Sequence, residues 1–234
     1  MAEEEPSRYI DPDADMILRS ATDILKNADI FSVQVDVTYD EVLESWAKLE
    51  RAREVLALVQ RPGKFSARIA EDTGGFRDIF YNGKKITVHD IESNFYGEIK
   101  VPKTIDAALD KAVSKYNLNA PLADIITSDP YANFVENARL GVYVGPSFVG
   151  ETPTHHLFFS HEVVDVQLWI DDGGVPLIRK IVITYKDGGS APQFRAQFDG
   201  WDFVPDYPDS VYEFEEAKSA QKIDVLELKR KWRW

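Results

Sequence analysis

The chain has 234 residues, with 27 Lys and Arg against 40 Asp and Glu, so its formal charge is −13. This acidic excess argues against binding to nucleic-acid phosphates or anionic lipid head groups. The lack of cysteine excludes disulfides, thiolate nucleophiles and zinc-thiolate or iron–sulfur sites. The length and an ordinary hydrophobic content of 44% fit a globular protein with a sizeable core.

The start of the chain is polar, and we expect a flexible N-terminus over residues 1–10. Residues 1–6 are acidic where a secretory leader would be basic and then apolar, so an exported protein would have a leader that is absent from this sequence. No apolar run reaches the roughly 18 residues that a membrane-spanning helix needs. We expect residues 11–234 to form one domain with a polar C-terminal tail.

A helix is predicted over 11–28. Asp11 can cap it, Pro12 suits its first turn, and its apolar residues recur at helical spacing. Residues 30–39 alternate between apolar and polar side chains, which predicts a half-buried strand. The stretch 40–60 is ambiguous, because its Ala, Glu, Leu, Lys and Arg residues favour a helix by propensity.

Extended segments over 64–101 predict a meander of antiparallel strands. The strongest turn signal in the sequence is Asn82-Gly83, which lies between two strand-like runs. We expect a tight hairpin there, with positive φ at both residues.

Short amphipathic helices are predicted in the middle of the chain. Thr104 can cap a helix that reaches Tyr116, a short segment opens at Pro121, and Asp129-Pro130 opens a third helix. They separate two sheet-forming halves.

The second half of the sequence is again rich in strand patterns. Gly-rich turns at 171–174 and 186–189 predict that consecutive strands are antiparallel neighbours. The fold class is therefore α+β, an antiparallel sheet whose apolar face is covered by the helices at 11–28 and 104–138. The predicted strands are 141–150, 154–161, 163–171, 177–186 and 193–200.

Three histidines raise the question of a metal site. His155, His156 and His161 lie near Glu162 and Asp165, and imidazole with carboxylate suits zinc, iron or manganese. On a strand, however, His155 and His156 point to opposite faces, and His161 lies about 20 Å along from His155. Surface or strand-pairing histidines are the favoured interpretation, and we expect no metal and no cofactor.

The strand at 163–171 has two distinct faces. Val164, Val166, Leu168 and Ile170 share one face, whereas the other carries Asp165, Gln167 and Trp169. One interpretation is a central strand covered on both sides, with Asp165 paired to Arg179 or Lys180 on the next strand. The other is that the polar and aromatic row lines a cavity.

Nothing in the sequence points to catalysis. No serine lies in a Gly-x-Ser-x-Gly setting, and the Gly-rich segments lack the features of phosphate-binding loops. We therefore expect that the protein is not an enzyme.

Several short motifs resemble a family of predicted periplasmic bacterial proteins of unknown function, in the same order from about Asp11 to Pro205. That family is similar to the lipoprotein-carrier (LolA/LolB-like) superfamily. The motifs are Phe80-Tyr81-Asn82-Gly83-Lys84, Ile105-Asp106-Ala107-Ala108-Leu109, Pro121-Leu122-Ala123-Asp124, Ser128-Asp129-Pro130-Tyr131, His156-Leu157, Asp165-Val166-Gln167-Leu168-Trp169-Ile170 and Pro176-Leu177-Ile178-Arg179-Lys180.

The resemblance implies a strongly curved, unclosed antiparallel half-barrel with helices on its concave face and a hydrophobic cavity between them. It also implies that 48–60 is mostly strand, against propensity. The family supplies no established catalytic or binding residues. The candidate cavity residues on the inserted helices and the facing sheet are Leu109, Tyr116, Tyr131, Phe134, Phe158 and Trp169.

The resemblance favours a non-enzymatic periplasmic carrier or chaperone that binds the acyl chain of a lipid or lipoprotein, with a possible transient protein partner in the envelope. The acidic charge argues against nucleic acid as a partner. The alternative is an envelope structural or interaction module with a packed core and no ligand. A metal-dependent enzyme using His155, His156 or His161 is the third hypothesis. The basic and aromatic residues at 229–234 are expected to be a solvated tail.

Overall fold

The computed structural model describes residues 8–118, 121–186, 189–216 and 219–227. Within them lie the helices α1 (Pro12–Asn27), α2 (Ile105–Tyr116) and α3 (Pro130–Val135) and the 3-10 helices η1 (Ala123–Ile125) and η2 (Asp209–Tyr212). The strands are β1 (Tyr9–Ile10), β2 (Ile30–Val42), β3 (Lys48–Gln60), β4 (Lys64–Glu71), β5 (Phe76–Tyr81), β6 (Lys85–Asp90), β7 (Phe95–Lys100), β8 (Leu140–Val149), β9 (Thr152–Ser160), β10 (Val164–Asp171), β11 (Ile178–Tyr185), β12 (Gln193–Asp202) and β13 (Gln221–Ile223).

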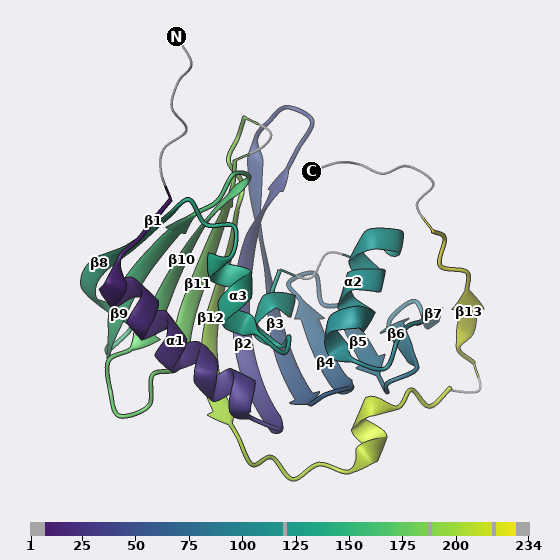
Figure 1. Ribbon diagram of the computed structural model, residues 1–234. Coiled ribbons are helices and arrows are strands. Elements are labelled where there is room, and N and C mark those ends of the chain that lie inside the picture. Colours follow the sequence, from purple (N-terminus) through teal and green to yellow (C-terminus); the bar gives the residue numbers. More distant parts are fainter. Residues whose placement is uncertain (1–7, 119–120, 187–188, 217–218, 228–234) are drawn as a thin grey trace. The chain divides into compact units, whose positions relative to one another are not determined.

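The hydrogen-bonded order of the strands is β1-β8-β9-β10-β11-β12-β2-β3-β4-β5-β6-β7-β13, so the sheet is open and ends at β1 and β13 (Figure 1). Antiparallel ladders run from β8 to β12 and from β3 to β7. The two end strands pair in parallel, β1 with β8 and β13 with β7. The predicted α+β class with an unclosed, mainly antiparallel sheet is confirmed.

The chain divides into two compact units, unit 1 (Met1–Asn27, Val37–Arg51 and Asp129–Phe198) and unit 2 (Ala28–Asp36, Ala52–Ser128 and Asp199–Trp234). The long strands β2 and β3 contribute residues to both. The single domain expected over 11–234 stays a prediction.

In unit 1, α1 covers one face of β8, β9 and β10 and also contacts α3 (Figure 1). Its buried residues lie on one stripe that faces the sheet. On β10, Leu168 and Ile170 are buried, whereas Trp169 between them is partly exposed. The apolar face predicted for this strand is therefore the one that the helix covers. The buried stripe of α1 consists of Ala14, Leu18, Ala21, Thr22 and Leu25.

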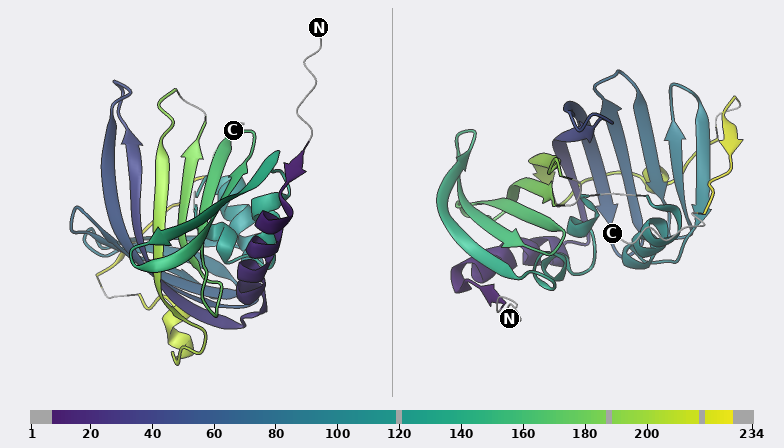
Figure 2. Two further views of the ribbon diagram at one scale, coloured as in Figure 1. Left: turned by 90° about the vertical axis from the view of Figure 1, so that its left-hand side faces the viewer. Right: turned by 90° about the horizontal axis from the view of Figure 1, so that it is seen from above.

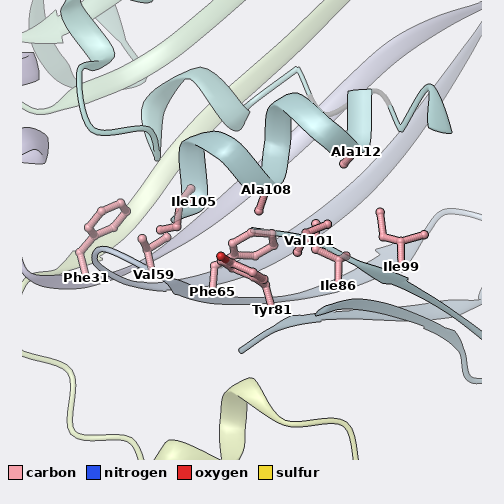
Figure 3. Close-up of a cluster of buried hydrophobic side chains, with 10 residues drawn as sticks. All are labelled: Phe31, Val59, Phe65, Tyr81, Ile86, Ile99, Val101, Ile105, Ala108 and Ala112. Atoms are coloured by element: carbon pink, nitrogen blue, oxygen red, sulfur yellow. The ribbon is translucent and has the colours of Figure 1, made fainter. Parts of the chain in front are cut away.

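In unit 2, α2 lies over the strands β4 to β7 (Figures 1 and 3). Thr104 caps the helix as predicted, because its side chain accepts a hydrogen bond from the Ala107 N–H. Figure 3 shows Ala108 and Ala112 pointing from the helix toward the sheet. The buried cluster beneath it comprises Phe31, Val59, Phe65, Tyr81, Ile86, Ile99, Val101, Ile105, Ala108 and Ala112.

The segment 205–216, predicted as part of a polar tail, packs on the other face of this sheet. η2 contacts β4 and β5. The Phe214 ring lies 4.7 Å from the Tyr96 ring and 5.9 Å from the Phe80 ring, measured between centroids. Residues 228–234, which carry the basic and aromatic tail, lie outside the described residues.

The strand predicted over 48–60 by resemblance, against helix propensity, is confirmed as β3. It pairs with β4 from Arg53 opposite Glu71 to Gln60 opposite Lys64. These backbone hydrogen bonds to a neighbouring strand outweigh an intrinsic preference that amounts to only tenths of a kcal/mol per residue.

Two local predictions need correction. The hairpin at Asn82-Gly83 exists, but Tyr81 pairs with Ile86, so the loop is longer than two residues and only Gly83 has positive φ. The Asn82 side chain instead accepts hydrogen bonds from the Lys84 and Lys85 N–H groups. At the N-terminus, Tyr9–Ile10 form β1, so regular structure begins before residue 11; residues 1–7 lie outside the described range.

Among the described residues, no helix has the length and apolar character that a membrane crossing requires.

Candidate functional site

Unit 2 contains an apolar cavity of about 330 Å³ between β6, β7, the end of α2 and the C-terminal segment. This volume lies at the lower end of the roughly 300–1,000 Å³ that is typical of ligand sites. Of its ten lining residues, seven are apolar, one is glycine and two are polar. They are Ile86, Val88, Asp90, Ser93, Phe95, Gly97, Ile99, Leu118, Ile223 and Val225.

The floor of the cavity is one face of the sheet edge. Ile86 lies opposite Ile99 across β6 and β7, and Val88 lies opposite Gly97. Because side chains alternate along a strand, these residues share a face. Ile223 of β13 pairs with Gly97 and continues the second row across a third strand.

The helical cover stops above this face. α2 ends at Tyr116, and Asn117 has a φ of 52°, the left-handed conformation that commonly terminates a helix. The Leu118 N–H then bonds back to the Ala112 carbonyl at 3.1 Å. Leu118 is thereby brought over the sheet as part of the cavity lining. The cavity lies where α2 no longer covers the strands.

The C-terminal segment forms the outer wall, and Figure 2 (right) shows β13, in yellow, beside β7. Val225 lies so close to the sheet that a Cβ atom built on Gly97 would come within 2.6 Å of the Val225 Cγ2 atom. Glycine at position 97 is therefore what lets this segment approach. The Asn94 side-chain amide donates to the Ser219 hydroxyl at 3.0 Å, and the Lys222 ammonium pairs with the Glu98 carboxylate.

The polar end of the cavity lies at the turn between β6 and β7. The Asp90 Oδ1 atom accepts hydrogen bonds from the Ser93 N–H at 2.9 Å and from the Ser93 hydroxyl at 2.7 Å. These two bonds hold the pKa of the Asp90 carboxyl below its usual value. The carboxyl is therefore ionised at neutral pH and can accept a hydrogen bond from a ligand.

Two of the predicted cavity residues lie in unit 2. Leu109 and Tyr116 are partly buried on α2 and pack against the hydrophobic cluster beneath it. The Tyr116 hydroxyl donates to Glu227 at 3.4 Å. Neither residue is among those that line the cavity.

Two further candidates belong to α3 in unit 1. Phe134 is buried, and the Tyr131 hydroxyl donates to the Asp15 carboxylate. The Arg19 guanidinium lies 3.8 Å from the centre of the Tyr131 ring and bonds its hydroxyl at 2.6 Å. These contacts join α1 to α3.

The last two candidates, Phe158 and Trp169, differ in placement from the expectation that they face the helices. Phe158 lies opposite Gln167 and Trp169 lies opposite His156, in the register of β9 and β10. That face alternates with the buried face of Leu168, so both aromatic residues lie on the side away from α1. Because successive side chains of a strand point to opposite faces, these two residues lie on the face that α1 does not cover.

Trp169 is held on that face by three side chains. The His156 ring stacks on it at 4.2 Å between centroids, the Lys180 ammonium lies 4.8 Å from the ring centre, and the indole N–H donates to Ser147 at 3.2 Å. The polar and aromatic row predicted on this strand is thus a set of cross-strand contacts.

The ion pair predicted for Asp165 needs correction. Asp165 lies opposite Thr184, not opposite Arg179 or Lys180, and its carboxylate pairs with the Lys186 ammonium at 2.7 Å. Arg179 pairs with Asp171 instead, also at 2.7 Å. The ladder between β10 and β11 shifts register between Trp169 and Ile170, which the sequence pattern does not show.

The three histidines have separate partners. The His155 Nε2 atom lies 2.7 Å from an Asp172 carboxylate oxygen, whereas the His161 Nε2–H donates to the Phe134 carbonyl at 3.1 Å. The described ranges hold no group of three or more His, Cys, Asp or Glu side chains placed to bind a metal ion.

Sequence reasoning missed the residues that line the cavity. The signal for its floor was present, because Ile86 and Val88 alternate with polar residues, and Glu98 separates Gly97 from Ile99 in the next strand. The wall formed by Ile223 and Val225 had no local signal, since its position depends on pairing with a strand more than a hundred residues earlier.

Comparisons with known proteins add a family and a fold. The family model described as "Predicted periplasmic protein (DUF2092)" matches residues 14–226. No curated protein matches the sequence.

Solved structures of low sequence identity resemble the chain. LprF from Mycobacterium bovis is 14% identical, with 85% of this chain and 97% of that chain covered and a TM-score of 0.52. The lipoprotein LppX from Mycobacterium tuberculosis is 12% identical, with coverages of 84% and 98% and a TM-score of 0.51. A LolA superfamily protein from Nitrosomonas europaea is 13% identical, with coverages of 86% and 97% and a TM-score of 0.37. The likeness to LprF and LppX is one of fold.

Proposed function

The chain belongs to the DUF2092 family of predicted periplasmic proteins, and we propose that it is a non-enzymatic carrier or chaperone that shelters the acyl chain of a lipid or lipoprotein in the cavity of unit 2. The resemblance predicted from the sequence is thereby confirmed for the family, and the family's description gives the periplasmic location. A transient protein partner in the envelope, to deliver or receive the cargo, is part of the same proposal.

The observation that supports this proposal best is the apolar cavity itself. Its lining includes seven apolar side chains from β6, β7, the turn after α2, and β13 with the residues that follow it. Its volume of about 330 Å³ suits part of an acyl chain. Each buried methylene contributes about 0.8 kcal/mol, or roughly a fourfold gain in affinity, before ordering costs. A cavity of this kind therefore favours a long apolar chain over a small polar metabolite.

A direct test is native mass spectrometry of protein purified without detergent, followed by titration with a neutral phenylnaphthylamine dye. We expect a co-purifying lipid or, in stripped protein, saturable dye binding that long-chain alcohols displace. No lipid and no saturable dye binding would contradict the carrier proposal and favour an envelope interaction module.

A variant that fills the cavity sharpens this test. Val88 lies on the cavity floor and is partly buried, so Val88→Phe places additional ring atoms in the space a ligand would occupy. We expect dye and alcohol affinity to fall by roughly tenfold or more, the equivalent of two or three excluded methylenes. The thermal midpoint should change little, because the added ring fills empty space.

The matched control is Val113→Phe. It makes the same change in size on the exposed side of α2, where Val113 is 50% exposed. Its affinity should equal that of the wild type, and an equal loss in both variants would contradict the assignment of the cavity.

A further inference from the structure

The solvent exposure of the lining residues increases from one end of the cavity to the other. At one end Ile86 and Ile99 are each only 4% exposed. Along the same strands toward the turn that joins them, Phe95 is 38% exposed, and Ile223 on the neighbouring strand is 50% exposed. An elongated ligand would therefore place its apolar end at Ile86 and Ile99 and its other end near the turn.

The turn end contains the polar groups of the cavity lining. Asp90 is the sole charged lining residue, and Ser93 the sole hydroxyl, in the part of the chain that the structure describes. Both Ser93 bonds go to the Asp90 Oδ1 atom, so Oδ2 accepts no hydrogen bond from the described residues. This oxygen is an acceptor at the place where a ligand's polar group would lie.

Among the described residues, the side chains around the turn carry more negative than positive charge. Arg77 lies opposite Asp90 in the ladder, and its charge helps to lower the pKa of the Asp90 carboxyl. Its guanidinium also lies 3.6 Å from a Glu71 carboxylate oxygen, so two carboxylates share this cation. Glu92 lies in the turn itself and adds a further carboxylate. The net charge of −13 also repels anionic groups, at longer range.

We propose that this cavity, in its role as the acyl-chain site proposed above, takes an amphiphile with a hydrogen-bond-donating head group that is uncharged or cationic, and discriminates against fatty acids and phosphate-bearing lipids. The chain lies toward Ile86 and Ile99, and the head group donates a hydrogen bond to Asp90. A carboxylate or phosphate at the same place would meet the like charges of Asp90 and Glu92, while the charge of Arg77 is already shared by the Asp90 and Glu71 carboxylates.

The test compares dodecanol, dodecylamine and dodecanoate, which share one chain length and differ only in head group. Affinities for the full chain are measured by displacement of the neutral dye at neutral pH and low salt. We expect dodecanol and dodecylamine to bind at least about tenfold more tightly than dodecanoate. Raising the salt concentration should narrow the gap between dodecylamine and dodecanoate, because it screens the charge of Asp90.

Asp90→Asn separates the charge from the shape of the site. The amide oxygen of Asn can still accept from Ser93, so the turn keeps its hydrogen bonds. We expect dodecanoate to gain affinity, dodecylamine to lose it, and dodecanol to change least. Asp110→Asn is the matched control, because it removes the same charge from an exposed position on α2 and should leave all three affinities unaltered.

The outcomes distinguish this inference from the function on which it rests. If the three amphiphiles bind equally well, or dodecanoate binds best, the head-group assignment is overturned while the carrier function stands. The same holds if Asp90→Asn and Asp110→Asn behave alike. If none of the three binds, both proposals fail.

Discussion

At the scale of single residues, His161 links the fold of unit 1 to pH. Its Nε2–H donates to the Phe134 carbonyl, and its Nδ1 atom is buried without a partner among the described residues. Protonating the ring would leave a buried N–H unpaired, and burial indeed lowers the pKa of His161 below its usual 6.5. Burial lowers the pKa of His156 in the same way.

The sign of the effect follows from proton binding. Below about pH 6.5, His161 binds a proton in the unfolded chain, whereas in the folded protein it stays neutral to lower pH. The free energy of unfolding should therefore fall as the pH drops from about 7.5 to 5.5. Urea unfolding measured across this pH range tests the predicted fall in the free energy of unfolding. His161→Gln, which keeps a donor for Phe134, should reduce this slope without abolishing it, because His156 also has a lowered pKa. An unchanged slope would show that His161 does not contribute to it.

At the scale of elements, β13 depends on the glycine it docks against. Gly97→Ala would bring a Cβ atom within 2.6 Å of Val225, so the C-terminal segment must shift. Overpacking of this kind costs about 1–3 kcal/mol. We expect faster amide exchange in Gln221–Ile223 and faster release of bound alcohol or dye.

A second substitution provides the control. Val225→Ala in the Gly97→Ala background removes the methyl groups that clash, so it should slow the exchange of β13 again. If the double variant exchanges as fast as Gly97→Ala alone, the contact between Gly97 and Val225 does not hold β13 in place.

Elements with local signals could be predicted from the sequence. Thr104 begins α2 through its cap, and Asp129-Pro130 begins α3 in the same way, because capping depends on neighbouring residues alone. Strand alternation likewise identified the buried face of β10. What alternation could not show is which face a helix covers, and Phe158 and Trp169 were therefore placed on the wrong side.

The candidate site was harder to predict than the fold, because three distant segments build it. β6 and β7 supply the floor, the turn after α2 supplies Leu118, and β13 supplies the wall. Each segment has ordinary local features. Only the parallel pairing of β13 with β7 makes them one cavity, and a pair of three residues leaves almost no trace in a sequence.

At the scale of the whole molecule, the division of the chain into two compact units implies that a ligand stabilises them unequally. All the lining residues of the cavity belong to unit 2. A ligand that binds only the folded state stabilises what it contacts by RT ln(1 + [L]/Kd), about 2.7 kcal/mol at a hundredfold excess over Kd. The free energy required for local opening of unit 2 should rise by that amount.

Hydrogen exchange followed by mass spectrometry, with and without dodecanol, measures this difference. We expect the added protection to concentrate in β6, β7, the turn after α2 and β13, and to be much smaller in β9, β10 and α1, whose core is built from other residues. Val88→Phe supplies the internal reference, because it should remove the protection in unit 2 without altering exchange in unit 1. Protection centred on β9 and β10 instead would place the ligand at Phe158 and Trp169 and would refute the cavity of unit 2 as the site.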